Sequence, residues 1–130
     1  MKRSNISSGS PFEAIAGFSR AVRVGNSISI AGTAPIATDG STAAPGDVYG
    51  QTHRCFEIIQ QAIVEAGGSI QDVVRTRIML TDISRWKEAT RAHGEIFGSI
   101  RPVCTLVEVS RLIEKDWLVE IEADCVLAEN

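Results

Sequence analysis

"LVEIEADCV", residues 118–126, is the stretch of sequence that decides the fold. Apolar and acidic residues alternate along it: Val119, Ile121, Ala123 and Cys125 against Glu120, Glu122 and Asp124. Strict alternation is typical of a β-strand that buries one face. A row of three carboxylates is too costly to bury without partners. The strand therefore has a core side and an acidic side, and the acidic side must meet water, a partner subunit or a ligand cleft.

The elements upstream are predicted from similar patterns. A β-hairpin is expected to turn at Gly25 and Asn26, with a second arm that runs through residues 28–31 into Gly32. The remaining predicted elements are two helices, at about residues 48–66 and 84–97, and two strands, at residues 73–80 and 103–109. The order is β-β-α-β-α-β-β. Because each helix carries one apolar stripe, both should pack on one face of a single sheet, in one α+β domain that spans residues 1–130.

The strand at residues 73–80 carries two basic residues that bear on the acidic face. Its alternation separates Val74, Thr76, Ile78 and Leu80 from Val73, Arg75, Arg77 and Met79. Arg75 and Arg77 either neutralise the acids of the last strand or are simply solvated. The sequence leaves both alternatives open.

The bulk properties exclude several classes of partner. The chain has 130 residues, a formal net charge of −3 and 13 scattered basic residues, so no footprint for nucleic acid is visible. No apolar run approaches the ~18 residues that a membrane span needs. The N-terminal stretch has two basic residues but no apolar region after them, which argues against a secretory signal. We expect no nucleic-acid partner and no membrane contact.

The cysteines and histidines predict neither a disulfide framework nor a metal site. The three cysteines are odd in number and far apart, as expected for reduced thiols in a cytoplasmic protein. There is no CxxC pair, and His53 and His93 are also widely separated, so a zinc site has little support. His93 lies on the apolar stripe of the second helix and is expected to be a core or interface residue, whereas His53 is expected to be solvated.

Several motifs together resemble one family. "GNSISIAGTAPI" (residues 25–36), "AIVEAGGSIQDVVRTRIMLTDISRW" (62–86), "VEVSRL" (107–112) and "LVEIEADCV" are similar to stretches of the RidA/YjgF family, the reactive intermediate deaminases once labelled L-PSP endoribonucleases. The likeness covers roughly residues 16–127, and the predicted order of elements agrees with it.

The resemblance implies a fold, an assembly and an activity. The expected fold is the chorismate-mutase-like α+β fold, assembled as a homotrimer with three ligand clefts between neighbouring subunits. Members typically hydrolyse enamines and imines, such as 2-aminoacrylate, to 2-keto acids and ammonia, and they use no cofactor. A cleft arginine grips the substrate carboxylate, and a glutamate on the last strand helps to place the attacking water.

The expected arginine is replaced in this chain. The family stretch reads Pro, small residue, Arg, then Ser or Thr, and here Pro102, Val103 and Thr105 match while Cys104 takes the place of the arginine. A guanidinium holds a carboxylate through two charge-assisted hydrogen bonds, whereas a thiol offers one weak donor. Cys104 is either a nucleophile or ligand contact, or a passive apolar residue, which is the usual behaviour of free cysteine. No Cys–His–Asp spacing supports catalysis by it.

The resemblance assigns five further positions to the cleft. Phe18 corresponds to an aromatic hydroxyl, Ala31 and Gly32 to a Ser-Gly pair that offers backbone groups, and Thr90 to an asparagine. The glutamate is kept as Glu120, which is either a general base or a hydrogen-bonded interface carboxylate. Gly32 is expected mainly to permit close packing of backbone.

Two functions remain as hypotheses. The first is a cofactor-free hydrolase of a small enamine or imine other than the usual 2-aminoacrylate type, with Glu120 and Cys104 as the candidate catalytic residues. The second is a binding or regulatory trimer that uses the clefts without turnover. Ribonuclease activity, which one family label suggests, is disfavoured by the weak basic character.

Overall fold

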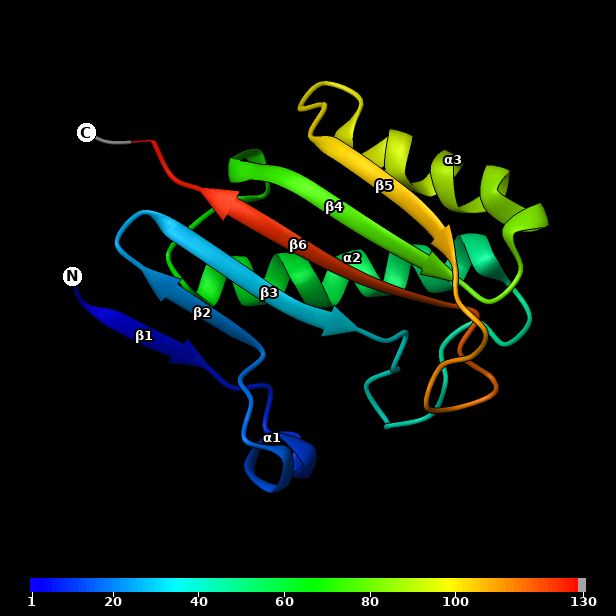
Figure 1. Cartoon of the computed structure of the whole chain (residues 1–130), viewed down its shortest axis with the longest axis horizontal. Coiled ribbons are helices and arrows are strands. Elements are labelled where there is room, and N and C mark those ends of the chain that lie inside the picture. Colours follow the sequence, from blue (N-terminus) through cyan, green and yellow to red (C-terminus); the bar gives the residue numbers. More distant parts are fainter. Residues whose placement is uncertain (129–130) are drawn as a thin grey trace.

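The computed structural model describes residues 1–128 and contains one mixed β-sheet. Its strands are β1 (Arg3–Ile6), β2 (Ala21–Val24), β3 (Ser27–Thr33), β4 (Val73–Leu80), β5 (Val103–Glu108) and β6 (Val119–Val126). They lie in the order β1-β2-β3-β6-β4-β5, and only the β4–β5 pair is parallel (Figure 1). The acidic strand β6 is therefore a central strand.

The helices are α1 (Pro11–Ala16), α2 (Val48–Glu65) and α3 (Trp86–Phe97), with single 3₁₀ turns at Ile70–Asp72 and Ile83–Arg85. Asp47 caps α2 by accepting a hydrogen bond from the Gly50 amide, and Gly67, at φ 89°, lets the chain turn away after the helix. Helix α2 packs on β3 and β6, and α3 packs against α2 on the same side of the sheet. No helix within residues 1–128 is long and apolar enough to cross a membrane.

Two N-terminal elements were not predicted from the sequence. Strand β1 extends the sheet by pairing with β2, and α1 is a helix of six residues. Helix α1 begins where the Ser10 hydroxyl accepts the Phe12 amide, with Pro11 in the first turn, and it ends at Gly17, at φ 76°. Both elements are too short to show a clear periodicity. The second large helix also begins two residues later than predicted, because residues 83–85 form a 3₁₀ turn.

A β-bulge corrects the predicted alternation at the start of β4. The register against β6 shifts between Val73 and Arg75, so Val73 turns to the core and Val74 is the extra residue. Val73 is accordingly 3% exposed and Val74 44% exposed, the reverse of the predicted grouping. From Thr76 onward the predicted alternation is confirmed: Thr76, Ile78 and Leu80 are buried.

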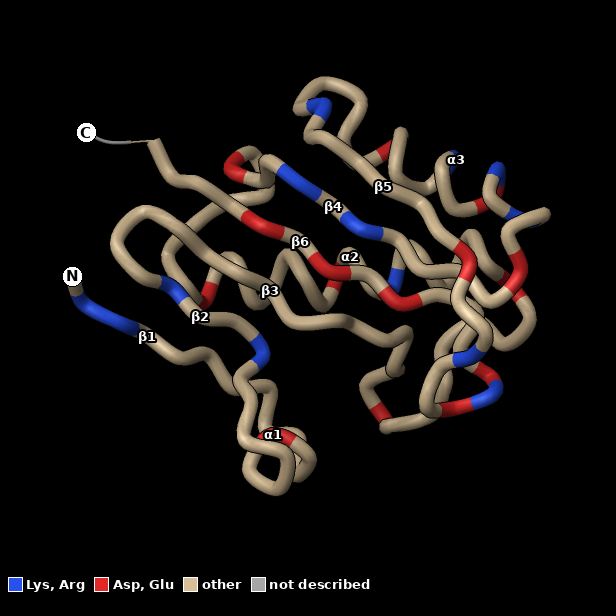
Figure 2. The backbone as a smooth tube through the Cα atoms, viewed as in Figure 1, with Lys and Arg blue, Asp and Glu red and all other residues tan. Residues whose placement is uncertain are grey.

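The face of the sheet without helices carries a ladder of opposite charges. Arg77 Nη1 lies 3.0 Å from Glu122 Oε1 and 3.4 Å from Asp124 Oδ2, and Arg75 Nε lies 4.0 Å from Asp124. Figure 2 shows these residues as blue segments on β4 beside red segments on β6. Of the two alternatives left by the sequence, the structure supports neutralisation. The third acid, Glu120, lies opposite Met79 instead of an arginine.

Candidate functional site

The site begins with the close approach of β3 and β6 at Gly32. The register between the two strands shifts between Ile30 and Thr33, which marks a bulge around Gly32. A Cβ atom built on Gly32 would lie 2.6 Å from Glu120 Oε2, closer than non-bonded atoms approach. Gly32 therefore leaves the space that the Glu120 carboxylate occupies, which agrees with the close packing expected from the sequence.

Glu120 differs from the other acids of β6 in its electrostatic surroundings. Among residues 1–128 it has neither an ion pair nor a side-chain hydrogen bond, whereas Glu122 and Asp124 both pair with arginine. Burial raises the pKa of Glu120 above its ordinary value; the Arg20 charge opposes this shift and Glu122 adds to it. A partly buried carboxylate with a raised pKa suits proton transfer or the positioning of a water molecule.

Arg20 is a second charged residue at this site, and the sequence reasoning did not include it. Its guanidinium donates a hydrogen bond from Nη2 to the Gly32 carbonyl at 2.6 Å. Its backbone carbonyl accepts the Ala31 amide at 3.0 Å, which joins the segment before β2 to the bulge. The signal in the sequence was its spacing: Arg20 lies two residues after Phe18, a position already assigned to the cleft.

The other expected cleft residues fall into two groups. Ala31 and Gly32 lie on β3, where Gly32 meets Glu120, and Phe18, which is 44% exposed, lies on the segment between α1 and β2. Thr90 lies on α3, where its hydroxyl donates to the Trp86 carbonyl at 3.1 Å, and Cys104 lies on β5, the far edge of the sheet.

Cys104 and Glu120 lie on opposite faces of the sheet. Cys104 is level with Thr76, and Thr76 with Ala123; both neighbours are buried on the helix side. Strand spacing of about 4.8 Å and a rise of about 3.3 Å per residue separate the two Cα atoms by roughly 14 Å. One subunit therefore does not bring Cys104 and Glu120 to a common small ligand.

The histidines and thiols have clear structural environments. His93 is hydrogen-bonded to Thr76 Oγ1 at 2.8 Å and packs between Phe56 and Phe97, and burial lowers its pKa. This is the core role favoured by the sequence. His53 lies 2.9 Å from Glu95 Oε1, so it has a partner in addition to solvent. Cys55 and Cys125 are buried and Cys104 is exposed. Residues 1–128 contain no group of three potential metal ligands.

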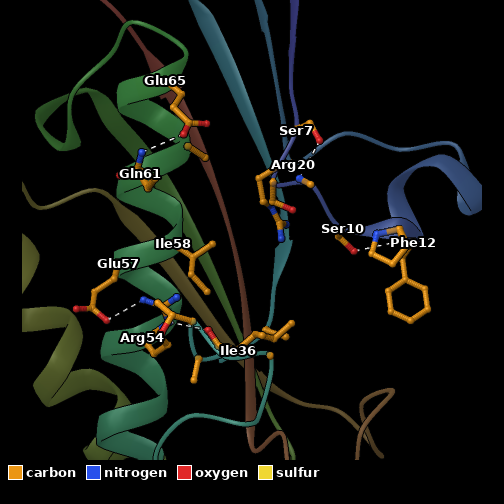
Figure 3. A pocket seen from close by; sticks show the side chains of 18 residues that line it. Ser7, Ser10, Phe12, Arg20, Ile36, Arg54, Glu57, Ile58, Gln61 and Glu65 are labelled. Carbon is orange, nitrogen blue, oxygen red and sulfur yellow. Dashed lines mark hydrogen bonds and ion pairs between the residues drawn. The ribbon is translucent and has the colours of Figure 1, made fainter.

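A separate groove of about 820 Å³ opens between α2 and the N-terminal segment that leads into α1 (Figure 3). Arg20 lines this groove, together with serine hydroxyls and apolar side chains. Glu120 does not line it.

Comparisons with known proteins agree with this architecture. A family model described as Endoribonuclease L-PSP matches residues 8–127. A RutC family protein of Pyrococcus abyssi is 40% identical over 106 residues, which cover 82% of this chain and 83% of the relative. The 3-aminoacrylate deaminase RutC of Acinetobacter baylyi is 30% identical over 101 residues, with 78% and 79% covered. A crystal structure of a YjgF/YER057c/UK114 family member from Mycobacterium tuberculosis superposes with a TM-score of 0.88 at 45% identity, covering 97% of this chain and 100% of that chain.

The sheet order, the two helices on one face and the bulge beside a strand carboxylate define a chorismate-mutase-like α+β domain. Within that class, this chain belongs to the RidA/YjgF family, formerly named after L-PSP endoribonuclease. The family and fold expected from the motifs are thereby confirmed.

Proposed function

We propose that this protein hydrolyses small enamines or imines and releases ammonia. The observation that carries the proposal is the Glu120 carboxylate, which lies unpaired against Gly32 while its two neighbours on β6 are neutralised. The name of the RutC relative, a 3-aminoacrylate deaminase, supports the same class of reaction.

The proposed reaction is balanced by one water molecule. Proton exchange with solvent converts the enamine to its imine tautomer, with one proton added to carbon and one lost from nitrogen. Water then adds to the C=N carbon, and Glu120 accepts a proton from that water as the C–O bond forms and delivers it to nitrogen, which gives a carbinolamine. Glu120 next takes the hydroxyl proton as the C=O bond forms and transfers it to nitrogen as the C–N bond breaks. The products are a carbonyl compound and ammonia. A carboxyl group with a raised pKa is suited to both transfers because it exchanges protons closer to neutral pH.

We propose that the complete cleft forms between subunits of a homotrimer. The opposite orientations of Cys104 and Glu120 support this, because Cys104 could approach a ligand at Glu120 only from a second copy. The helix-free face also exposes apolar side chains, Val103 and Val107 on β5 and Val126 on β6. Sedimentation equilibrium should give three times the chain mass of 14.0 kDa. A stable monomer at micromolar concentration would contradict the shared cleft.

The substrate is proposed to differ from 2-aminoacrylate. With Cys104 where the resemblance places a clamping arginine, the charge-assisted contact of that arginine is absent; such a contact contributes about 1.5–3 kcal/mol. We therefore expect weak turnover of 2-aminoacrylate generated in situ, measured as ammonia release. Turnover of 3-aminoacrylate, for which the RutC relative is named, should be compared in the same assay. The Cys104→Arg variant should gain activity towards 2-aminoacrylate, with Cys104→Ser as the matched control.

The second candidate is a small-molecule-binding protein without turnover. The replacement at Cys104 is the observation that favours it, because binding alone does not require the substrate to be oriented by a fixed cation. A cytoplasmic location is proposed for either function, from the reduced thiols expected of its sequence. Binding of a 2-keto acid without any ammonia release from the enamine panel would favour this candidate over the hydrolase.

A further inference from the structure

We propose that the groove between α2 and the N-terminal segment is a second binding site, which takes a small organic monocarboxylate with a short apolar body. The anchor for the carboxylate is Arg20. The proposed occupant is identified only by its chemistry, and the site is separate from the cleft residues Cys104 and Thr90. The proposal does not depend on deaminase activity, because it is tested by binding.

The hydrogen bonds of Arg20 leave donors available. A guanidinium carries five N–H groups, and within residues 1–128 the only acceptor that Arg20 reaches is the Gly32 carbonyl. The Nε atom is buried without a hydrogen-bond partner. A ligand in the groove cannot reach that inaccessible atom, so its acceptor would be met by the terminal N–H groups that the Gly32 carbonyl does not use.

The charge of Arg20 is also not compensated by a direct ion pair. Burial lowers the pKa of Arg20, although an arginine remains protonated, and the charges of Glu13 and Glu120 counter the shift from a distance. Neither carboxylate lies within the 4.0 Å of an ion pair. A partly desolvated cation without a paired anion is unfavourable, and a bound carboxylate would relieve that penalty.

The second arginine of the groove is already engaged. Arg54 donates from Nε to the Ile36 carbonyl at 2.7 Å, and its Nη1 lies 3.5 Å from Glu57 Oε1. Figure 3 shows dashed lines that join Arg54 on α2 to Glu57 and to Ile36, with Arg20 on the other side of the groove. Of the two arginines that line the groove, Arg20 is therefore the one without a carboxylate partner among residues 1–128.

The rest of the wall selects the kind of anion. Ser10 Oγ accepts the Phe12 amide, so its hydroxyl proton remains for donation to a ligand, whereas the Ser7 side chain is hydrogen-bonded to Glu13. Ile36 and Ile58 supply apolar surface, and the volume of about 820 Å³ lies in the range of small-molecule sites. Glu57 and Glu65 balance the charge of the two arginines that line the groove, which disfavours dianions such as phosphate.

The test is a titration of the full-length protein with sodium hexanoate, followed by amide chemical shifts in two-dimensional NMR. Hexanoate should shift the amides of Ser8, Ile58 and Gln61 in a saturable way, whereas hexanol and inorganic phosphate should not at the same concentration. Loss of binding in Arg20→Gln, with full binding in Arg23→Gln, is the expected result. Arg23 is a matched control because it lies on β2 but donates to Gly25 and Ala66, outside this groove.

A second variant guards against misfolding of Arg20→Gln. Ile58→Glu keeps Arg20 and adds a negative charge to the apolar wall, so it should weaken hexanoate binding at least tenfold. The proposal is overturned if hexanoate causes no saturable shifts, if Arg20→Gln binds as the wild type does, or if phosphate binds equally well. Ammonia release from enamines plays no part in these outcomes, so they are independent of the proposed deaminase function.

Discussion

The Glu120 carboxylate occupies the space in which a side chain on Gly32 would begin, with Oε2 2.6 Å from the position of a Gly32 Cβ. Gly32 has a negative or extended φ, so its role is to provide space and not unusual backbone geometry. The bulge in β3 and the carboxylate on β6 are thus two parts of one arrangement. A single carbon atom added at Gly32, as in an alanine, would displace the Glu120 carboxylate.

Gly32→Ala should reduce deaminase activity without unfolding the protein. The atom that must move is the end of a flexible side chain, so the fold can adapt while the carboxylate is displaced. We expect a loss of about tenfold or more in kcat, since a displacement of about 1 Å in a catalytic group can lower the rate by up to 100-fold. Gly94→Ala is the control: nothing lies within 4 Å of its Cβ, it is on α3, and it should be neutral or stabilising. Equal activity of wild type and Gly32→Ala would refute the link between these residues.

The stability of the protein should respond to Glu120 with an unusual sign. Because its pKa is raised in the folded protein, folding favours the protonated form, and the ionised form becomes destabilising as the pH rises through that pKa. Glu120→Gln should therefore raise Tm at pH 7, and the difference should disappear below the unfolded value of about 4.3. Glu122→Gln should instead lower Tm at pH 7, because it removes the ion pair with Arg77. Thermal unfolding by circular dichroism at several pH values checks both signs.

The three thiols should differ in their rates of alkylation. Cys104 is exposed, whereas Cys55 and Cys125 are buried. Burial raises the pKa of Cys55 strongly and that of Cys125 to about 12, with the nearby Asp72 and Asp124 charges contributing to the latter. Iodoacetamide under native conditions should therefore modify Cys104 first, as followed by peptide mass spectrometry. Faster modification of either buried thiol would contradict the placement of the strands.

Much of the fold was predictable from the sequence because the hydrophobic periodicity of its main elements extends over many residues. Strand β6 alternates over its full length, and α2 carries a stripe over 18 residues with an aspartate cap. The N-terminal β1 and α1 were missed because four and six residues give no period. The bulge at Val74 was missed because a single inserted residue looks like ordinary alternation in sequence, and only the pairing with β6 reveals it.

Only those parts of the candidate site that a single residue can identify were predictable from the sequence. The family resemblance assigned Gly32 and Glu120 to the same cleft, but their direct contact is seen only in the structure. The contact between Arg20 and Gly32 was not evident, because an arginine at the start of a hairpin usually points into solvent. The separation of Cys104 from Glu120 depends on strand order and on which face each residue takes, and neither is encoded near those residues.

The most direct test of the proposed function is to compare ammonia release by the wild type, Glu120→Gln and Glu122→Gln with enamines generated in situ. The two glutamates share one strand and one face, but only Glu122 is paired with an arginine. We predict that Glu120→Gln loses ~100-fold or more in activity, the usual contribution of general acid–base catalysis, while Glu122→Gln stays within a few-fold of the wild type. Equal activity of the wild type and Glu120→Gln, or equal losses in both variants, would contradict the assignment of Glu120 as the catalytic group.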